Sequence, residues 1–360
     1  MITFYYIFSG LLVFFSIIPL IQNQHWFFRF FDFAKVQILF FQTVIFIFAW
    51  WFISHSTWFY IMQVFLIACM IYECFLLYKY TPLYPLDKKE RTTNSSKSID
   101  VLSANVYQFN TKYDNFIQLV GKSSPDIVVT MESNKDWENA LQVLKTDYPH
   151  FVEVSLENTY GIHLYSKFPF AFSKVHYFVA DDIPSIEVLC KTSDGFTFRL
   201  FGVHPPPPSP TEEENSKERD GELLAVAKEV RKKDIPTVVV GDFNNVAWAK
   251  SSILFRKTAQ MIDPRIGRGL ISTFHAKYWF LRFPIDQMFH STDIFVEKIK
   301  ALKNFGSDHL PLYVKFFIDK KNGEQEDEVE DLEKGDMKEV NKLIQEGKKE
   351  ESDREEVVTE

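Results

Sequence analysis

The sequence predicts a layered α/β domain that follows a strongly hydrophobic N-terminal segment. Residues 1–80 contain long runs without charged side chains. Residues 99–318 instead alternate short apolar stretches with polar or helix-like stretches, a pattern typical of strands and helices arranged in layers. A chain of 360 residues fits about two such units at roughly 150 residues per domain.

Three apolar runs, at about 1–21, 36–54 and 58–78, predict transmembrane helices. Each is long enough to cross a hydrocarbon core of about 30 Å, and a helix satisfies its own backbone hydrogen bonds in lipid. The first run lacks the basic start and the small-residue cleavage site of a signal peptide. We therefore expect residues 1–80 to form a retained multi-pass anchor whose partner is the lipid bilayer of an inner or plasma membrane.

Basic residues beside the runs predict the orientation of this anchor. Arg29 and Lys35 lie in the first loop and four basic residues lie within 79–91, whereas the second loop, 55–57, contains no lysine or arginine. Because basic loops tend to remain in the cytoplasm, we expect the soluble domain to be cytoplasmic.

Glu73 is the one acidic residue within the predicted spans. A carboxylate inside a span raises the hypothesis of a functional site. Glu73 also lies about one and a half turns before Lys79, and we favour the simpler interpretation that its side chain extends to the membrane interface. With so few ionisable residues, a transporter role for the spans is disfavoured.

The segments on either side of the soluble domain are polar. Residues 81–98 are predicted to be a linker, and residues 319–360 an acidic charged tail that is disordered or helical, with a sparse apolar stripe that leaves partner binding as the minor alternative. The cysteines at 69, 74 and 190 show neither a disulfide pattern nor zinc-ligand spacing, and we expect buried reduced thiols.

Polar side chains stand at the ends of the apolar stretches of the soluble domain. The predicted strands are 99–104, 126–131, 196–203, 237–240, 283–285 and 310–317, and the residues beside them are Asn105, Glu132, His204, Asp242 with Asn244, Asp286, and Asp308 with His309. Helices are predicted at 112–122, 137–147 and 213–233. Because strand ends meet at one edge of a sheet and loops there carry function, we expect these side chains to converge.

The motifs around these residues resemble the endonuclease/exonuclease/phosphatase superfamily. They are SANVYQFN, VVTMES, GVHPPPP, VVVGDFNN, PIDQM and GSDHLPL, in the expected order, and they cover about residues 99–318. The GDFN and SDH elements are the most specific. The resemblance implies a four-layer α/β/β/α sandwich of the deoxyribonuclease I type and a metal-dependent hydrolase of phosphodiesters or phosphomonoesters.

The residue types suit this chemistry, because cleavage of a phosphoester adds negative charge that a metal ion and fixed donors must stabilise. Hard oxygen ligands such as Glu132, with Asn105 and Asp308, suit Mg²⁺ or Mn²⁺. The resemblance implies Glu132 as the principal ligand. It also implies that Asp242 positions or deprotonates the attacking water and that His309, oriented by Asp286, acts as general base or phosphate ligand. Asn244 and His204 would then bind the phosphate.

Each of these residues also has a purely structural interpretation. Asp242 and Asn244 are common turn residues, and His204 before four prolines is compatible with a strand cap. The sequence departs from the family at Gln287, where histidine or tyrosine often follows the aspartate. The prolines 205–208 and glutamates 212–214 predict a stiff acidic loop that disfavours a bulky polyanion near His204.

The sequence does not decide whether the substrate is a lipid headgroup or a nucleic acid. Basic and acidic residues nearly balance in the soluble domain, and no zinc finger or helix-turn-helix pattern is present. The anchor slightly favours a membrane-proximal phosphoester. A membrane-tethered nuclease and a non-catalytic phosphate-binding module are the alternatives, and no protein partner can be inferred.

Overall fold

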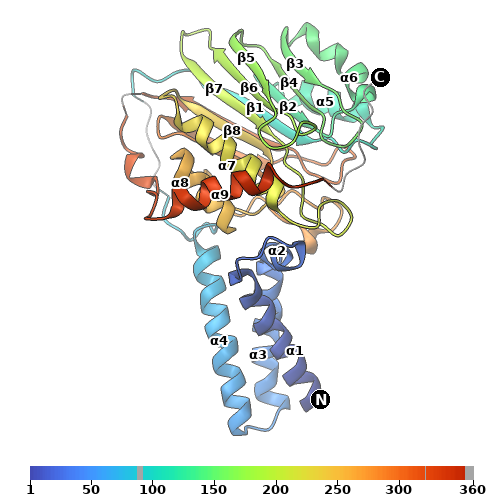
Figure 1. Cartoon of the computed structure of the whole chain (residues 1–360), viewed down its shortest axis with the longest axis vertical. Coiled ribbons are helices and arrows are strands. Elements are labelled where there is room, and N and C mark those ends of the chain that lie inside the picture. Colours follow the sequence, from blue (N-terminus) through green and yellow to red (C-terminus); the bar gives the residue numbers. More distant parts are fainter. Residues whose placement is uncertain (87–91, 321, 353–360) are drawn as a thin grey trace.

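The computed structural model describes residues 1–86, 92–320 and 322–352. A stalk of helices from the N-terminal part stands below a layered domain (Figure 1). Part of the predicted linker (87–91) and the end of the predicted tail (353–360) lie outside the described residues.

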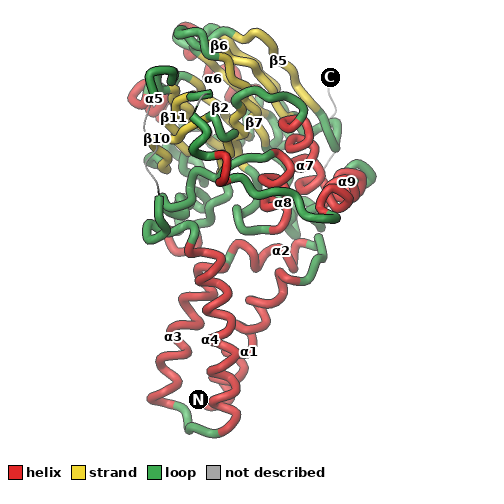
Figure 2. Tube along the Cα trace, turned by 90° about the vertical axis from the view of Figure 1, so that its left-hand side faces the viewer, coloured by secondary structure: helices red, strands yellow, loops and turns green. Residues whose placement is uncertain are grey.

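The stalk contains three helices that are long and apolar enough to cross a membrane. They are α1 (Ile2–Ile17, continued by the 3₁₀ turn η1, Ile18–Leu20), α3 (Lys35–Phe52) and α4 (Thr57–Tyr78). A short helix that the sequence analysis missed, α2 (Trp26–Phe33), lies across the domain-facing end of the stalk (Figure 2). Because α2 and the layered domain lie at the same end, both face the same side of any membrane that the stalk crosses.

The prediction that Glu73 extends toward the interface is wrong. Its side chain is fully buried among the three long helices, where it accepts a hydrogen bond of 2.7 Å from the Ser16 hydroxyl. The ammonium group of Lys35, also fully buried, lies 3.9 Å from the same carboxylate oxygen. A buried charge is retained when it is paired and hydrogen-bonded, and Lys35 supplies a closer partner than Lys79.

Two mixed β-sheets form the centre of the domain. The six-stranded sheet has the order β10 (Ile294–Ala301), β11 (Leu312–Ile318), β1 (Ile99–Asn105), β2 (Ile127–Met131), β4 (Ile162–Ser166) and β3 (His150–Val154). The five-stranded sheet has the order β5 (Phe170–His176), β6 (Ser185–Lys191), β7 (Thr197–Val203), β8 (Thr237–Asp242) and β9 (Asp286–His290). In each sheet one central pair is parallel: β1 with β2, and β7 with β8.

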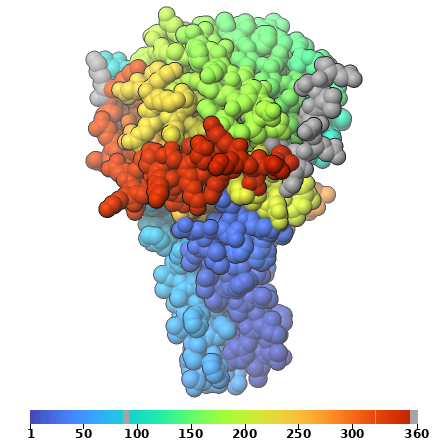
Figure 3. Space-filling view, in the orientation of Figure 1, coloured from blue at the N-terminus to red at the C-terminus, as the bar shows by residue number. Residues whose placement is uncertain are grey.

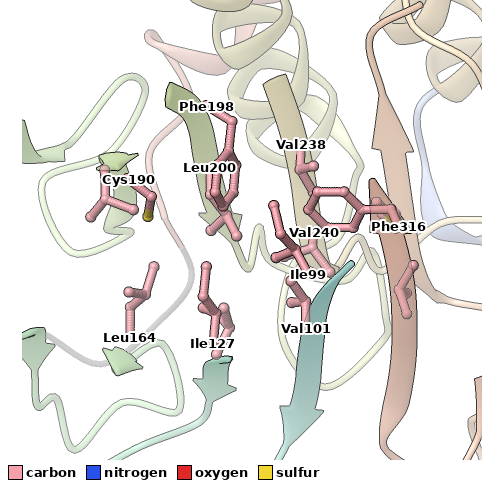
Figure 4. Close-up of a cluster of buried hydrophobic side chains, with 14 of the residues drawn as sticks. Ile99, Val101, Ile127, Leu164, Cys190, Phe198, Leu200, Val238, Val240 and Phe316 are labelled. Atoms are coloured by element: carbon pink, nitrogen blue, oxygen red, sulfur yellow. The ribbon is translucent and has the colours of Figure 1, made fainter. Parts of the chain in front are cut away.

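The two sheets pack face to face through apolar side chains, most of them aliphatic (Figure 4). Side chains alternate between the two faces of a strand, so Val101 in β1 and Val240 in β8 enter this inter-sheet core while Leu102 and Val239 point to the outer sides. Both faces of the central strands are therefore buried, which explains why their residues are largely apolar.

Helices cover both outer faces and complete the predicted α/β/β/α sandwich. Helix α5 (Tyr113–Ser123) and α6 (Lys135–Leu141, continued by η2, Gln142–Thr146) pack on the six-stranded sheet. Helices α7 (Lys217–Arg231), α8 (Lys250–Ala259) and α9 (Asp336–Gly347) pack on the five-stranded sheet. Two further 3₁₀ turns, η3 (Trp279–Leu281) and η4 (Glu326–Glu328), lie in connecting segments.

Helix α9 falls within the segment expected to be a disordered or helical tail. It lies on the surface of the domain beside α7 and α8 (Figure 3). Val340 is fully buried and Ile344 nearly so, and both join a hydrophobic cluster with residues of α7 such as Leu223. The sparse apolar stripe is therefore the buried face of an amphipathic helix, whose charged side chains point outward.

We expect Ile344→Ala to destabilise the layered domain by about 2 kcal/mol, the lower end of the range for truncating a buried isoleucine. Urea unfolding of the full chain in detergent, followed by tryptophan fluorescence, measures the change. The matched control is Gln345→Ala, which truncates an exposed side chain of the same helix. Equal stability of the two variants would mean that α9 contributes no packing energy.

Candidate active site

The strand ends of the two sheets meet at one rim of the sandwich. Asn105 ends β1 and Glu132 follows β2 in one sheet, while His204 follows β7 and Asp242 ends β8 in the other. The sequence analysis predicted that Asp286 follows a strand, and this is wrong. Asp286 is the first residue of β9. Antiparallel pairing places it directly opposite Asp242, at the same rim. The preceding Pro284 has no backbone N–H, which disfavours the predicted strand over 283–285.

Gly241 is required for the position of Asp242. Its φ angle is +152°, and a Cβ atom built on it would lie 2.0 Å from the carbonyl oxygen of Val203 in the neighbouring strand β7. A side chain at this position would push β8 away from β7. The glycine of the GDFN motif therefore allows the close strand pairing that presents Asp242.

Asn105 connects the two sheets. Its side-chain amide donates to Glu132 Oε1 at 2.8 Å and to Asp242 Oδ2 at 3.2 Å. Its amide oxygen accepts the backbone N–H of Tyr107 at 2.9 Å, which fixes the orientation of the amide group. The nearly buried amide therefore holds one carboxylate from each sheet at a fixed separation.

Glu132 is held in place by its backbone and by two hydrogen bonds. Its φ angle of +58° lies in the left-handed region, a cost of about 1–3 kcal/mol that functional sites often carry. The backbone N–H of Gln108 donates to Oε2 at 3.1 Å. Burial raises the pKa of Glu132 to about 7, although the hydrogen bond from Asn105 and the charge of His309 oppose the increase. A cation beside this carboxylate would favour its ionised form.

His309 lies between two carboxylates. Its Nδ1 is 2.8 Å from Asp286 Oδ2, and its Nε2 is 3.6 Å from Asp242 Oδ2. Burial lowers the pKa of His309, but Asp286 and Asp242 outweigh that effect and raise it to about 10. The ring is therefore an imidazolium at neutral pH, oriented by Asp286 toward Asp242.

His204 and Asn244 border the same carboxylate of Asp242. His204 Nε2 is 3.9 Å from Asp242 Oδ2, and its ring lies against that of Tyr160 with centroids 5.3 Å apart. Burial lowers the pKa of His204 to about 4, so the ring is neutral, and its buried Nδ1 has no hydrogen-bond partner within the described part of the chain. Asn244, with φ +47°, donates one amide hydrogen to the carbonyl of Pro205 at 3.0 Å, which leaves the second for a ligand.

All eight residues that the sequence analysis selected lie around one cavity of about 440 Å³. Six of them line it directly: Glu132, His204, Asp242, Asn244, Asp308 and His309. Asn105 and Asp286 stand behind them and reach the cavity through their hydrogen bonds to Glu132, Asp242 and His309. The cavity therefore presents carboxylates, imidazoles and an amide to one small volume.

Two groups of residues around the cavity offer ligands for a metal ion. Asp242, Asp286 and His309 have ligand atoms within 4.8 Å of one another, but His309 Nδ1 and Asp286 Oδ2 already share a short hydrogen bond. The carboxylates of Glu132 and Asp308 line the cavity, and no lysine or arginine of the described residues forms an ion pair with Glu132. These hard oxygen ligands fit a divalent cation such as Mg²⁺ better than the hydrogen-bonded trio does.

A family model described as "Endonuclease/Exonuclease/phosphatase family" matches residues 102–309, more than half of the chain. The chain belongs to this family. Its members are phosphoester hydrolases. No curated protein matched the sequence.

Solved structures share the fold. A family protein from Bacteroides thetaiotaomicron is 20% identical with a TM-score of 0.52, and the match covers 63% of this chain and 97% of that one. A humanized D. rerio TDP2 is 16% identical with a TM-score of 0.52, over 61% of this chain and 99% of that one. A family protein from Bacteroides vulgatus is 17% identical with a TM-score of 0.51, and the match covers 62% of this chain and 100% of that one.

The sequence analysis missed residues that position the site through backbone groups. Ser307 Oγ donates to the Asn105 carbonyl at 2.8 Å and accepts the His309 N–H at 3.0 Å. Gln108 supplies its N–H to Glu132. Gln108 lies within the motif SANVYQFN and Ser307 within GSDHLPL. Their place in these motifs is the sequence signal that could have identified them.

Gln287, the departure from the family pattern, points away from the cavity. Side chains alternate along β9, so Gln287 faces away from Asp286 and accepts a hydrogen bond of 2.7 Å from buried Arg265. Gln287 therefore takes no part in the contact between the Asp286 carboxylate and His309.

The His309–Asp286 pair predicts a pH dependence of stability. The pKa of about 10 in the folded chain exceeds the unfolded value of about 6.5, so the pair stabilises fully below pH ~6.5, and this contribution is lost as the pH rises through 10. We therefore expect Asp286→Asn to lower the melting temperature most at pH 6 and progressively less toward pH 10. Melting curves in EDTA measure this, with the exposed Asp181→Asn as control. A difference that is constant with pH would contradict the assignment.

Proposed function

We propose that the protein is a membrane-anchored hydrolase that uses Mg²⁺ or Mn²⁺ to cleave a phosphodiester or phosphomonoester with water. The supporting observation is the amide of Asn105, which joins Glu132 and Asp242 within one cavity beside His309. This arrangement gathers acidic, amide and imidazole groups from both sheets where a phosphate fits.

The residues have complementary roles in this proposal. Asp242 orients the attacking water, whose oxygen bonds to phosphorus as the phosphorus–oxygen bond to the leaving group breaks. The water gives up one proton and the leaving oxygen takes up one, so the protons balance. The His309 imidazolium, held by Asp286, donates to a phosphate oxygen. The second amide hydrogen of Asn244 and the neutral ring of His204 supply further donors.

Glu132 would hold the divalent ion, with Asn105 and Asp308 beside it. A bound ion supplies positive charge that stabilises the extra negative charge on the phosphate during cleavage. The cavity that Glu132 and Asp308 line suits an ion that retains several waters, as Mg²⁺ does.

The three long apolar helices support membrane anchoring. The basic residues of the first loop and of the segment after α4 favour a cytoplasmic catalytic domain. The anchor would keep the enzyme beside the bilayer surface, where phosphoester headgroups are concentrated.

We expect Glu132→Gln to reduce hydrolysis of bis(4-nitrophenyl) phosphate by about 10³-fold, because the neutral amide cannot neutralise the ion. The wild-type activity should depend on added Mg²⁺ or Mn²⁺ and disappear in EDTA. Glu351→Gln, at an exposed glutamate, is the matched control. Full activity of Glu132→Gln, or of the wild type in EDTA, would refute the proposed metal role.

We expect a reporter fused after the last residue to report a cytoplasmic location. A fluorescent protein that folds only in the cytoplasm should be bright, and an alkaline phosphatase fusion, which needs an oxidising compartment, should be inactive. The opposite pair of results would place the catalytic domain outside.

A further inference from the structure

Helix α2 belongs to both halves of the molecule. Its position between α1 and α3 in the sequence places it at the end of the stalk. Its first residue, Trp26, donates a backbone hydrogen bond of 2.9 Å to the carbonyl of Glu214 in the catalytic domain. Near its other end, the carbonyl of Asp32 accepts the indole N–H of Trp248 at 2.8 Å. Figure 3 shows this part of the chain in contact with the domain above it.

Side chains of α2 form a wall of the catalytic cavity. Phe30 and Phe33 line the same cavity as Glu132 and His309. The Phe33 ring contacts that of Phe283, with centroids 6.1 Å apart. The cavity therefore runs from the buried carboxylates to aromatic side chains at the end of the stalk, and its lining changes from charged to apolar along the way.

Exposed aromatic residues surround the open side of this cavity. Phe30 is 53% exposed and Phe109, which follows β1 and also lines the cavity, is 67% exposed. Trp279 in η3, four residues before the cavity-lining Phe283 in the sequence, is 80% exposed. Soluble proteins rarely gather such side chains, but aromatic residues are enriched where a protein meets the membrane–water interface.

The η3 segment is attached directly to a predicted span. The side-chain amide of Gln37 in α3 donates to the carbonyl of Phe280 at 2.6 Å. The Phe280 ring packs against Phe40 and Phe41 of α3, with centroids 5.6 and 6.0 Å away. These contacts hold η3, which carries the exposed Trp279, beside the domain-facing end of α3. That end lies at the level of the bilayer surface if α3 spans a membrane.

We propose that the substrate is a phosphoester lipid of the bilayer that holds the stalk, and that its headgroup enters the cavity past Phe30 and Phe109 while its acyl chains remain in the membrane. This inference rests on the proposed hydrolase function and on membrane insertion of the three helices. An apolar entrance stabilises the first part of the acyl chain or glycerol backbone as the phosphate reaches the buried carboxylates.

Charge disfavours a nucleic acid in the same cavity. No lysine or arginine is among the described residues that line it, whereas Glu212 borders it. A polynucleotide needs several basic contacts along its backbone, but a single phosphate of a lipid needs only the donors and the ion at the inner end.

The test compares three kinds of substrate, namely vesicle lipids, a soluble ester and a single-stranded oligonucleotide, with one set of variants. The full chain, in vesicles of phosphatidylcholine, phosphatidylglycerol, sphingomyelin and phosphatidylinositol 4-phosphate, is assayed for release of each headgroup, and in parallel for hydrolysis of soluble bis(4-nitrophenyl) phosphate. We expect Phe109→Ser and Phe30→Ser to reduce cleavage of the lipid at least tenfold more than they reduce cleavage of the soluble ester. Val143→Ser, an exposed apolar residue of η2 away from the cavity, is the matched control.

The outcomes separate the two proposals. Cleavage of the soluble ester without cleavage of any vesicle lipid overturns the lipid inference and leaves the hydrolase proposal intact. Equal loss of both activities in the two variants also overturns it, because the residues would then support the site in general. Preferential cleavage of a single-stranded oligonucleotide, unaffected by either variant, assigns the cavity to nucleic acid instead. Failure to cleave any phosphoester with Mg²⁺ or Mn²⁺ refutes the hydrolase function itself.

Discussion

The side-chain amide of Asn105 donates to a carboxylate that follows β2 and to one that ends β8, and the rest of the site depends on that double hydrogen bond. Glu132 and Asp242 belong to different sheets, so their separation is set by the packing of aliphatic side chains between the sheets. A close-packed interior resists changes in that spacing. The core of the sandwich therefore determines the geometry of groups that lie at its rim.

The sequence was informative where strands are buried on both faces. Strands β1, β2, β7 and β8 are largely apolar because one face packs on the other sheet and one on the helices. A polar residue that follows such a strand is conspicuous, and this is why the side chains of the cavity could be selected from the sequence. The same logic misplaced Asp286, since a strand can also begin with its functional residue when it pairs antiparallel to the previous one.

The sequence was less informative where structure depends on distant partners. Strand β5 is largely exposed, so its side chains give no continuous apolar signal. Glu73 lies 57 residues from Ser16 and 38 from Lys35, and no local pattern links them. The sparse apolar stripe of the C-terminal segment was visible in the sequence, but its packing against α7 was not. These features follow from tertiary packing, which overrides local composition.

The junction between stalk and domain is also part of the site's support. Arg219 of α7, almost fully buried, binds Asp220 and donates to the carbonyl of Asn244 at 2.9 Å. Burial raises the pKa of Asp32 in α2 to about 6, against the opposing charges of Arg29, Lys35 and Arg219. The loop that carries Asn244 and the helix that closes the cavity thus share one buried charged region. A movement of α2 would alter the electrostatic surroundings of Arg219 and, through it, the support of Asn244. Because α2 is held between two apolar helices of the stalk, the position of the cavity relative to those helices is a built-in property of the fold rather than a consequence of a flexible tether.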